Sequence, residues 1–517
     1  MQILRPGHTC WRIEQADRVA LIVDAADYFR AAQAAMLKAQ HSILMIGWDF
    51  DTRISLDPTD ETDSHPAQLG AFLTWLVETK PGLHINILKW DLGMVKALWR
   101  GTTLLRVAQW ALHERITFKL DGAHPPGAAH HHKIVVIDDA VAFCGGIDMT
   151  GDRWDTSEHR DADPRRRRPF TKRAYGPWHD ATTAVSGQAA KALGDHARER
   201  WKRASGEVLA PPPGGSDPWP DGLPAQMAEV AVAIARTMPA YDTQTEVREI
   251  EALYVSAIAA ARRSVYLESQ YFASRAIAEA IARRLPEADG PEFVIVNPES
   301  AEGWLEEEVM GSARARLLAM LGRRDRFGRL RVYTPVTAGE QPIYVHAKIM
   351  IVDDRLLRVG SSNLNNRSMG YDTECDLAVE AEDDTTAEAI RSFRARLLAE
   401  HLGTSPERVS AIVAEQQSLI AAIEALAGPG RSLRPFKPPK IDGAEATLAD
   451  HETPRPGAPS FPLARREPSA PVNPEITIGV HDADYGRAVA RGAITTRLLL
   501  AEFGQGRWAP GGYSLSI

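Results

Sequence analysis

The chain has 517 residues, which is long enough for roughly two to four domains. Of these residues 44% are hydrophobic and 25% are charged, a composition that is ordinary for a globular protein. The formal net charge of -8 argues against a general nucleic-acid binder, which is usually basic overall. Three widely spaced cysteines argue against a disulfide framework and against a Cys-based zinc site. Because we find neither a signal-peptide segment nor an apolar run of about 18 residues, we expect a cytoplasmic protein with at most peripheral membrane contact.

Apolar periodicity predicts helices and strands in alternation along most of the chain. An Ala-rich helix followed by a buried strand is predicted at 31–50, and the same pair recurs at 255–272. Further strands are predicted at 84–91, 116–121, 180–185, 293–298, 330–335 and 374–379. Further helices are predicted around 94–113, 188–204, 303–321 and 385–401.

This alternation occurs twice, which indicates an α/β fold with two similar halves. A Pro/Gly-rich segment at 210–222 separates a first half, 1–209, from a second half, 223–405. The remainder, 406–517, is predicted to hold a helical segment and a Pro-rich, partly disordered tail.

One pattern recurs between the two halves. HHKIVVID (131–138) returns as HAKIMIVD (346–353), and the small-residue turn GGID (145–148) returns as GSSN (360–363), both 215 residues later. A single H-x-K-x4-D pattern arises by chance in roughly a few per cent of chains this long, and two in about one in a thousand. The pair therefore indicates one site assembled from both halves.

The histidine and lysine of each copy are two residues apart on a predicted strand. His131 and Lys133 therefore share a strand face, as do His346 and Lys348. Where two such strands meet, two imidazoles and two ammonium groups surround one small volume. The three histidines at 130–132 alternate in direction and cannot converge on an ion, so we predict no metal and no cofactor.

That set of groups suits attack on a phosphodiester. One imidazole attacks phosphorus to form a covalent phosphohistidine. The other protonates the leaving alkoxide and then deprotonates the incoming water or alcohol. The two lysines offset the charge on the non-bridging oxygens.

A nucleophilic imidazole needs an acceptor on its second nitrogen. The predicted strands DATTAV and ECDLAV align so that their first residues, Asp180 and Glu374, are equivalent. We expect Asp180 to orient His131 and Glu374 to orient His346. A structural role at the turn after each motif strand is expected for Asp138 and Asp353.

The turn after the second motif is a candidate phosphate-binding element. Gly360, Ser361, Ser362 and Asn363 can offer backbone N–H groups, hydroxyls and a side-chain amide. The first copy carries Asp148 in place of Asn363, and a carboxylate repels phosphate. The two halves are therefore expected to differ in function.

At these residues the sequence resembles the phospholipase D superfamily, over about residues 1–405. The segments that carry the resemblance, besides the repeated motif, are GGIDMTGDRWD (145–155), PWHD (177–180), ESQYF (268–272) and GSSNLNNRS (360–368). They look more like true phospholipases D than like the nuclease or cardiolipin-synthase branches.

The resemblance implies two α/β halves related by a pseudo-twofold axis, with mixed sheets flanked by helices and the site between them. It implies hydrolysis of a phospholipid headgroup ester at a membrane surface, with water or an alcohol as acceptor. His131 would be the nucleophile and Gln270 a substrate contact. Ser269 is a departure, because many relatives carry Asn there. No obligate oligomer is expected, since one chain holds both motifs.

Three alternatives remain open from the residues. A nucleic-acid phosphodiesterase could use the same site, although the acidic balance argues against it. A cardiolipin-synthase-type phosphatidyltransferase is disfavoured by the absence of apolar spanning segments. A non-enzymatic descendant is disfavoured because both motifs are intact.

The arginines at 165–168 form either a solvated loop or a basic lip for anionic lipid.

Overall fold

The computed structural model describes residues 2–59, 64–91, 109–110, 112–300 and 311–437. One compact unit comprises Met1–His451. The second unit, Glu452–Ile517, contains most of the predicted tail and lies outside the described residues. The predicted helix at 94–113 also falls almost wholly outside them, as does the first part of the helix predicted at 303–321.

The first half contains eight strands and three helices that the structure describes. In chain order they are β1 (Arg12–Val23), α1 (Ala25–Lys38), β2 (Ser42–Gly47), α2 (Leu69–Thr79), β3 (His84–Trp90), β4 (Ile116–Asp121), β5 (Ile134–Ile137), β6 (Val141–Gly145), β7 (Trp178–His179), β8 (Ala181–Gly187) and α5 (Gln188–Ser205).

The second half repeats this plan and adds a C-terminal helical segment. Its strands are β9 (Met227–Met238), β10 (Val247–Arg248), β11 (Ser264–Glu268), β12 (Phe272–Ala273), β13 (Glu292–Val296), β14 (Leu330–Val336), β15 (Tyr344–Val345), β16 (Ile349–Val352), β17 (Leu356–Gly360), β18 (Leu364–Asn365), β19 (Glu374–Glu380) and β20 (Ser432–Pro435). Its helices are α6 (Glu249–Ala260), α7 (Arg275–Arg284), α9 (Ser312–Arg324), α10 (Asn366–Gly370), α11 (Asp384–Leu402), α12 (Pro406–Gln416) and α13 (Leu419–Leu426).

A single 16-stranded mixed sheet joins the two halves within the described residues. From its centre outward, the first half runs β1-β8-β6-β5-β2-β3-β4, and the second runs β9-β19-β17-β16-β11-β13-β14. The orders are equivalent, so the sheet has the pseudo-twofold arrangement that the repeat predicts. The long strands β1 and β9 pair antiparallel at the centre, with Arg12 opposite Ile234.

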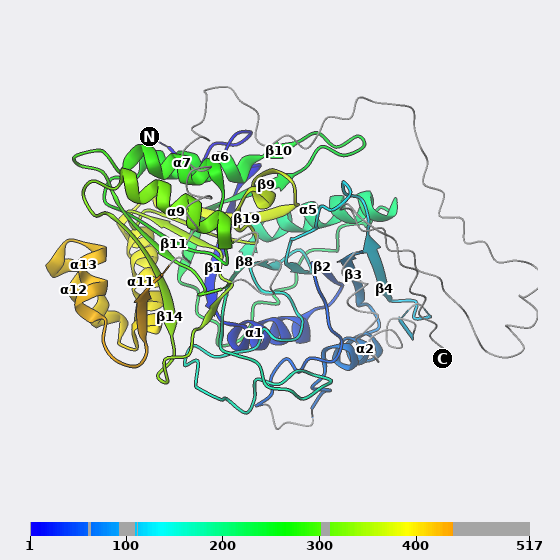
Figure 1. The fold of residues 1–517 in the computed structure, drawn as a ribbon. Helices are drawn as coiled ribbons and strands as arrows, with labels where there is room; N and C mark the ends of the chain where they lie inside the picture. The colour runs from blue at the N-terminus through cyan, green and yellow to red at the C-terminus, as the bar shows by residue number, and fades with distance from the viewer. Residues whose placement is uncertain (1, 60–63, 92–108, 111, 301–310, 438–517) are drawn as a thin grey trace, which may run out of the picture. The chain divides into compact units, whose positions relative to one another are not determined.

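Helices cover both faces of this sheet. In the second half, α6, α7 and α9 pack on one face, whereas α11 packs on the other (Figure 1). In the first half, α1 and α2 share one core cluster, whereas α5 belongs to the cluster that also contains α11. Buried strands such as β13, with sequence EFVIV, are apolar on both faces because helices cover each side.

The α/β fold is confirmed. The predicted strands correspond to β3, β4, β8, β13, β14 and β19, and the helices predicted around 188–204 and 385–401 correspond to α5 and α11. The domain boundaries stay predictions, although the described residues on either side of 210–222 share one sheet. Where the structure describes the chain, no helix has both the length and the apolar character needed to cross a membrane.

Candidate active site

Each repeated motif reaches across to the opposite half of the molecule. The backbone N–H of His131 donates to the carbonyl of Thr373, 2.9 Å away, and that of His346 donates to the carbonyl of His179 at 2.7 Å. The short strands β7 and β15 pair in parallel beside the second contact. Both histidines lie just before their motif strands, β5 and β16, rather than within them. Both motifs therefore lie at the interface between the two halves.

His131 is held by groups of the second half. Its Nδ1 lies 3.0 Å from Oε2 and 3.1 Å from Oε1 of Glu374. The same nitrogen lies 3.0 Å from the carbonyl oxygen of Ser361. Because a carbonyl can only accept, Nδ1 carries the hydrogen and the lone pair resides on Nε2. This is the tautomer that a nucleophilic imidazole needs.

His346 is held in the same way by the first half. Its Nδ1 lies 2.6 Å from Oδ2 of Asp180. The expected pairing of Asp180 with His131 and of Glu374 with His346 is therefore wrong, because each carboxylate orients the histidine of the opposite half. Each carboxylate directly follows the residue whose carbonyl accepts from that histidine, so the crossed backbone contacts fix the crossed side-chain pairs.

Both imidazoles are uncharged at neutral pH. Burial lowers the pKa of His131 well below its ordinary value, and Lys133 and Lys348 lower it further. The pKa of His346 is likewise lowered well below its ordinary value by burial, and further by Lys348 and Arg153. Burial also raises the pKa of Glu374 to about 8, although hydrogen bonds from Ser361 and Ser368 oppose the rise. His131 is the more accessible of the two, with 15% of its side chain exposed against 7% for His346.

The two lysines stand in different environments. Lys133 Nζ lies 3.1 Å from Oδ2 of Asp148, which also accepts from the backbone of Trp48 and Asp49. Asp148 is thus neutralised by a motif lysine. Lys348 is buried and donates to the carbonyl of His346. Burial lowers the pKa of Lys348 to about 7.

The lowered pKa of Lys348 predicts a measurable pH dependence of activity. Lys348 is charged below pH 7 and neutral above it, and only the charged form stabilises a phosphate anion. We expect kcat/KM, which reports the free enzyme, to fall as the pH rises through about 7. In Lys348→Arg the fall should move to higher pH, because a guanidinium does not titrate in this range. If the alkaline fall in kcat/KM stays at the same pH in Lys348→Arg, the fall reports the titration of another group.

The two serines of the turn after the second motif make hydrogen bonds within the protein. The N–H groups of Ser361 and Ser362 donate to Oδ1 of Asp376 at 3.0 and 3.2 Å. Their hydroxyls donate to Glu374 and Asp376 respectively, at 2.5 and 2.6 Å. In these contacts the serines hold the two carboxylates in place, and their expected role in binding phosphate stays a prediction. Asp376 is also paired with the buried guanidinium of Arg358.

Two other turn residues have distinct surroundings. Gly360 packs so closely on Asp376 that an added Cβ would lie 2.0 Å from Oδ1 of that residue, which explains the glycine. The backbone N–H of Asn363 donates to the hydroxyl of Ser368, while its side-chain oxygen is buried without a hydrogen-bond partner. An amide oxygen cannot donate to a phosphate, so the expected phosphate contact of Asn363 would need its side-chain Nδ2 and stays a prediction. Gly360 serves packing.

The motif aspartates anchor the connection that precedes β2 and β11. Asp138 accepts from the N–H groups of Gln40, His41 and Ser42 at 2.7 to 2.8 Å. Asp353 accepts from the N–H groups of three residues at the equivalent connection, Arg262, Arg263 and Ser264. Both carboxylates thus satisfy backbone donors away from the histidines.

An aromatic wall lies next to His346. Trp178 stacks on Tyr344 with ring centroids 4.6 Å apart, and Trp178 lies 5.2 Å from the ring of His346. Gln270 donates to the hydroxyl of Tyr344 at 2.8 Å, which places it beside this wall. Trp178 and Tyr344 line an open pocket of about 330 Å³. This pocket is the candidate entry for part of the substrate.

Arg153 is a further cation near His346 that the sequence motifs did not predict. Its guanidinium lies over the ring of Trp178, 4.2 Å from the centroid, and it helps to lower the pKa of His346. The signal was present in the RWD segment, but a lone arginine has no repeat partner to single it out. The arginines at 165–168 do not form a uniform lip, because Arg166 is buried against Asp155.

Comparisons with known proteins show which family the sequence resembles. The sequence profile of the family described as "Cardiolipin synthase, PLD-like domain" matches residues 254–397, which lie in the second half. Phospholipase D A of Dictyostelium discoideum is 26% identical over 477 residues, covering 77% of this chain. Phospholipase D alpha 4 of Arabidopsis thaliana is 23% identical over 503 residues, covering 74% of this chain.

The chain is shorter than these relatives and shares its fold with a solved structure. It spans 36% of the length of the Dictyostelium protein and 64% of that of the Arabidopsis protein. The phosphatidylserine synthase of Haemophilus influenzae Rd KW20 superposes with a TM-score of 0.51 at 12% identity, covering 80% of this chain and 95% of that one. The superposition shows that the shared fold includes both halves of this chain.

Proposed function

Because the chain belongs to the phospholipase D superfamily, we propose that it cleaves the headgroup ester of a phospholipid to leave phosphatidic acid, through a covalent phosphohistidine on His131. The observation that carries the proposal is the crossed arrangement of the two histidines. Each neutral imidazole is held through Nδ1 by a carboxyl group of the opposite half, and the two imidazoles flank two motif lysines. Curated relatives named phospholipase D support the lipid substrate.

In the first step, Nε2 of His131 forms a bond to phosphorus and the bond from phosphorus to the headgroup oxygen breaks. His346 donates the proton that this oxygen takes up. The resting His346 is neutral, and it takes up this proton from solvent as the phosphate anion binds, because a nearby opposite charge favours the protonated imidazole. Lys133 and Lys348 offset the negative charge that spreads over the non-bridging oxygens.

In the second step, the now neutral His346 takes a proton from water, whose oxygen attacks phosphorus. The bond between phosphorus and Nε2 of His131 breaks, which releases phosphatidic acid and restores the free imidazole. A short alcohol can replace water in this step, giving a phosphatidyl alcohol. Protein side chains supply every proton transfer in this scheme, so the scheme uses no metal ion.

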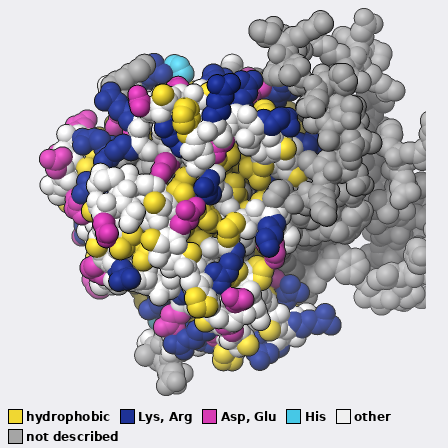
Figure 2. Space-filling model, turned by 60° about the vertical axis from the view of Figure 1, so that its left-hand side comes forward, with side chains coloured by type: hydrophobic (Ala, Val, Ile, Leu, Met, Phe, Trp, Pro, Cys, Tyr) yellow, Lys and Arg dark blue, Asp and Glu magenta, His cyan; other side chains and the backbone are white. Residues whose placement is uncertain are grey.

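The acidic balance of the chain and the names of its relatives favour a lipid substrate over a nucleic acid. On the face shown in Figure 2, Lys and Arg side chains are interspersed with Asp and Glu around a central band of apolar side chains. A nucleic-acid site calls instead for a basic stripe. We propose contact with a membrane surface as a peripheral protein, in a cytoplasmic setting. A monomer suffices, because one chain supplies both motifs.

Phosphatidyl transfer is the second candidate function. The matching family description names a cardiolipin synthase, and the superposed structure is a phosphatidylserine synthase. Both reactions pass the phosphatidyl group from the enzyme to an alcohol instead of to water. The two candidates share the first step and differ only in the acceptor.

The deciding experiment is product analysis with phosphatidylcholine and phosphatidylethanolamine vesicles, with and without a short primary alcohol. We expect phosphatidic acid alone in water, and phosphatidyl alcohol as well when the alcohol is present. His131→Asn, which keeps a polar side chain, should give neither product. Product only in the presence of alcohol would favour the transferase. Absence of lipid products, with cleavage of an oligonucleotide, would overturn the lipid assignment.

A further inference from the structure

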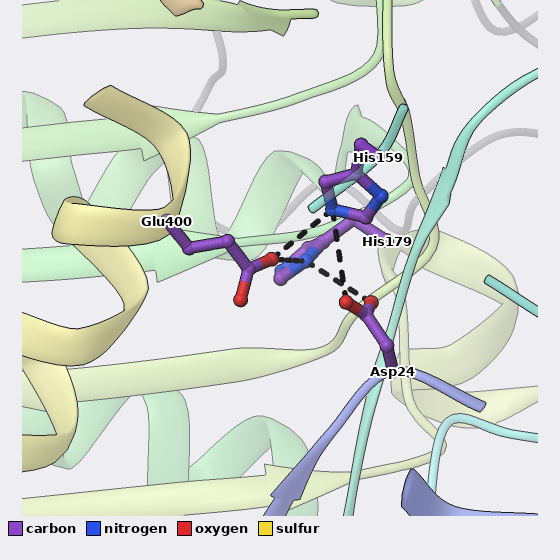
Figure 3. A group of neighbouring side chains, drawn as sticks. All are labelled: Asp24, His159, His179 and Glu400. Atoms are coloured by element: carbon purple, nitrogen blue, oxygen red, sulfur yellow. Dashed lines mark hydrogen bonds and ion pairs between the residues drawn. The ribbon is translucent and has the colours of Figure 1, made fainter. Parts of the chain in front are cut away.

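A second group of buried side chains lies beneath the active site. Asp24 follows β1, His159 lies in the loop before β7, His179 is in β7 and Glu400 is on α11 (Figure 3). One ligand atom from each of these four residues lies within 4.8 Å of the others. All four side chains are buried. The group thus draws three segments of the first half and one helix of the second half to one point.

The four ligand atoms converge closely. Oε1 of Glu400 lies 2.7 Å from Nδ1 of His179 and 3.1 Å from Nε2 of His159. Asp24 lies opposite, with its carboxylate oxygens 3.5 Å from His179 Nδ1 and 3.7 Å from His159 Nε2. Ligands at about 2.0 to 2.1 Å from a tetrahedral zinc ion are separated from one another by about 3.3 Å. The observed separations bracket that value.

The outward nitrogen of each histidine is held by a further carboxylate. Nδ1 of His159 lies 2.9 Å from Asp155, and Nε2 of His179 lies 2.7 Å from Glu268. Metal-binding histidines nearly always donate their other ring N–H to a carboxylate or carbonyl, which fixes the tautomer and turns the remaining nitrogen toward the ion. Both histidines here have that arrangement.

One oxygen that faces the group lacks a hydrogen-bond partner. Oδ2 of Asp24 is buried without a hydrogen bond, in a region where an unmatched polar atom is unfavourable. Asp24 also holds φ 66° and ψ 153°, a conformation that favours glycine, yet a carboxylate occupies the position. A bound cation would give this oxygen a partner.

We propose that Asp24, His159, His179 and Glu400 bind one structural divalent transition-metal ion of the zinc class. Two imidazoles and two carboxylates suit such an ion, and four protein ligands in a closed, buried site are typical of a structural role and not of a catalytic one. The ion would fasten α11 of the second half to β7 and to the end of β1. This site is independent of the proposed reaction, whose scheme uses none of these four side chains.

The ion would also support the placement of Asp180. The N–H of Asp180 donates to Oδ1 of Asp24 at 3.2 Å, and its carbonyl accepts from the N–H of Asp24 at 2.8 Å. Its neighbour His179 is itself a ligand. Asp180 in turn orients His346.

The test is elemental analysis of the purified full-length protein, followed by mild chelation and titration with zinc chloride. We expect about one equivalent of zinc per chain and a rise of several degrees in the thermal midpoint when zinc is returned to the metal-free protein. His159→Gln and Glu400→Gln should purify with less than half the metal, and zinc should not raise their midpoints. The proposal is overturned if the wild-type protein contains no metal and its midpoint ignores added zinc.

Two control variants separate this site from the rest of the molecule. His196→Gln alters a buried histidine that packs on His132, outside the group, and should retain the metal. His131→Asn should retain the metal while losing turnover, so that metal content and activity are read separately. Equal metal content in His159→Gln and His196→Gln would place the ion elsewhere and contradict the proposal. If His159→Gln fails to fold, the titration of the metal-free wild type still decides.

Discussion

Replacement of either His131 or His346 by asparagine is expected to lower kcat by at least about 10⁴-fold, because each removes a group that takes part in bond making or proton transfer. Asparagine retains an amide that can face Glu374 or Asp180, so the fold should persist. Steady-state release of headgroup from vesicles, with circular dichroism and thermal midpoints as checks on folding, measures the effect.

The two variants should differ when the leaving group needs no proton. With a nitrophenol in place of the headgroup alcohol, His346→Asn should still form the covalent intermediate and release about one equivalent of nitrophenol per chain in a burst. His131→Asn should give no burst, because it lacks the nucleophile. A burst from His131→Asn and none from His346→Asn would exchange the two roles. Normal turnover in either variant would contradict the two-histidine mechanism.

Glu374→Gln and Asp180→Asn are each expected to lower kcat by roughly 10²- to 10⁴-fold, because an amide does not enforce the tautomer that leaves Nε2 free for reaction. The loss should fall on kcat more than on KM, since neither carboxylate contacts the substrate in the proposed scheme. Vesicle kinetics at saturating and subsaturating lipid separate the two parameters.

Nuclear magnetic resonance of histidine labelled with ¹⁵N tests whether the pairs cross between the halves. Glu374→Gln should shift the ring nitrogens of His131 and leave those of His346 in place, because Glu374 lies 3.0 Å from Nδ1 of His131. Asp180→Asn should do the reverse, since its Oδ2 lies 2.6 Å from Nδ1 of His346. The opposite pattern of shifts would support pairing within each half.

The repeated motif predicted much of the molecule because repetition is visible in a sequence. The α/β alternation and the equivalence of Asp180 with Glu374 follow from comparing one half with the other. The pairing of each carboxylate with a histidine does not, because equivalent positions look the same whether contacts form within a half or across the interface. Only the backbone contacts from His131 to Thr373 and from His346 to His179 distinguish the two arrangements.

Other features left weaker traces in the sequence. The central strands β1 and β9 contain the apolar runs VALIV and VAVAIA, but both lie outside the repeated motif. An apolar run alone does not show which other strand it pairs with. The serines of the second turn look like phosphate ligands, and the sequence does not show that they bond to Asp376. The group of Asp24, His159, His179 and Glu400 has no spacing signature, because its members come from four separate segments.

The most direct measurement of the central claim is the site of the covalent intermediate. Wild-type protein turning over a lipid with a labelled phosphatidyl group would be quenched rapidly under alkaline conditions, digested and mapped by mass spectrometry. The mechanism predicts a phosphatidyl adduct on the peptide that contains His131, absent in His131→Asn. An adduct on the peptide that contains His346 would exchange the roles of the two histidines. Rapid turnover without any enzyme-bound phosphatidyl group would contradict the covalent mechanism itself.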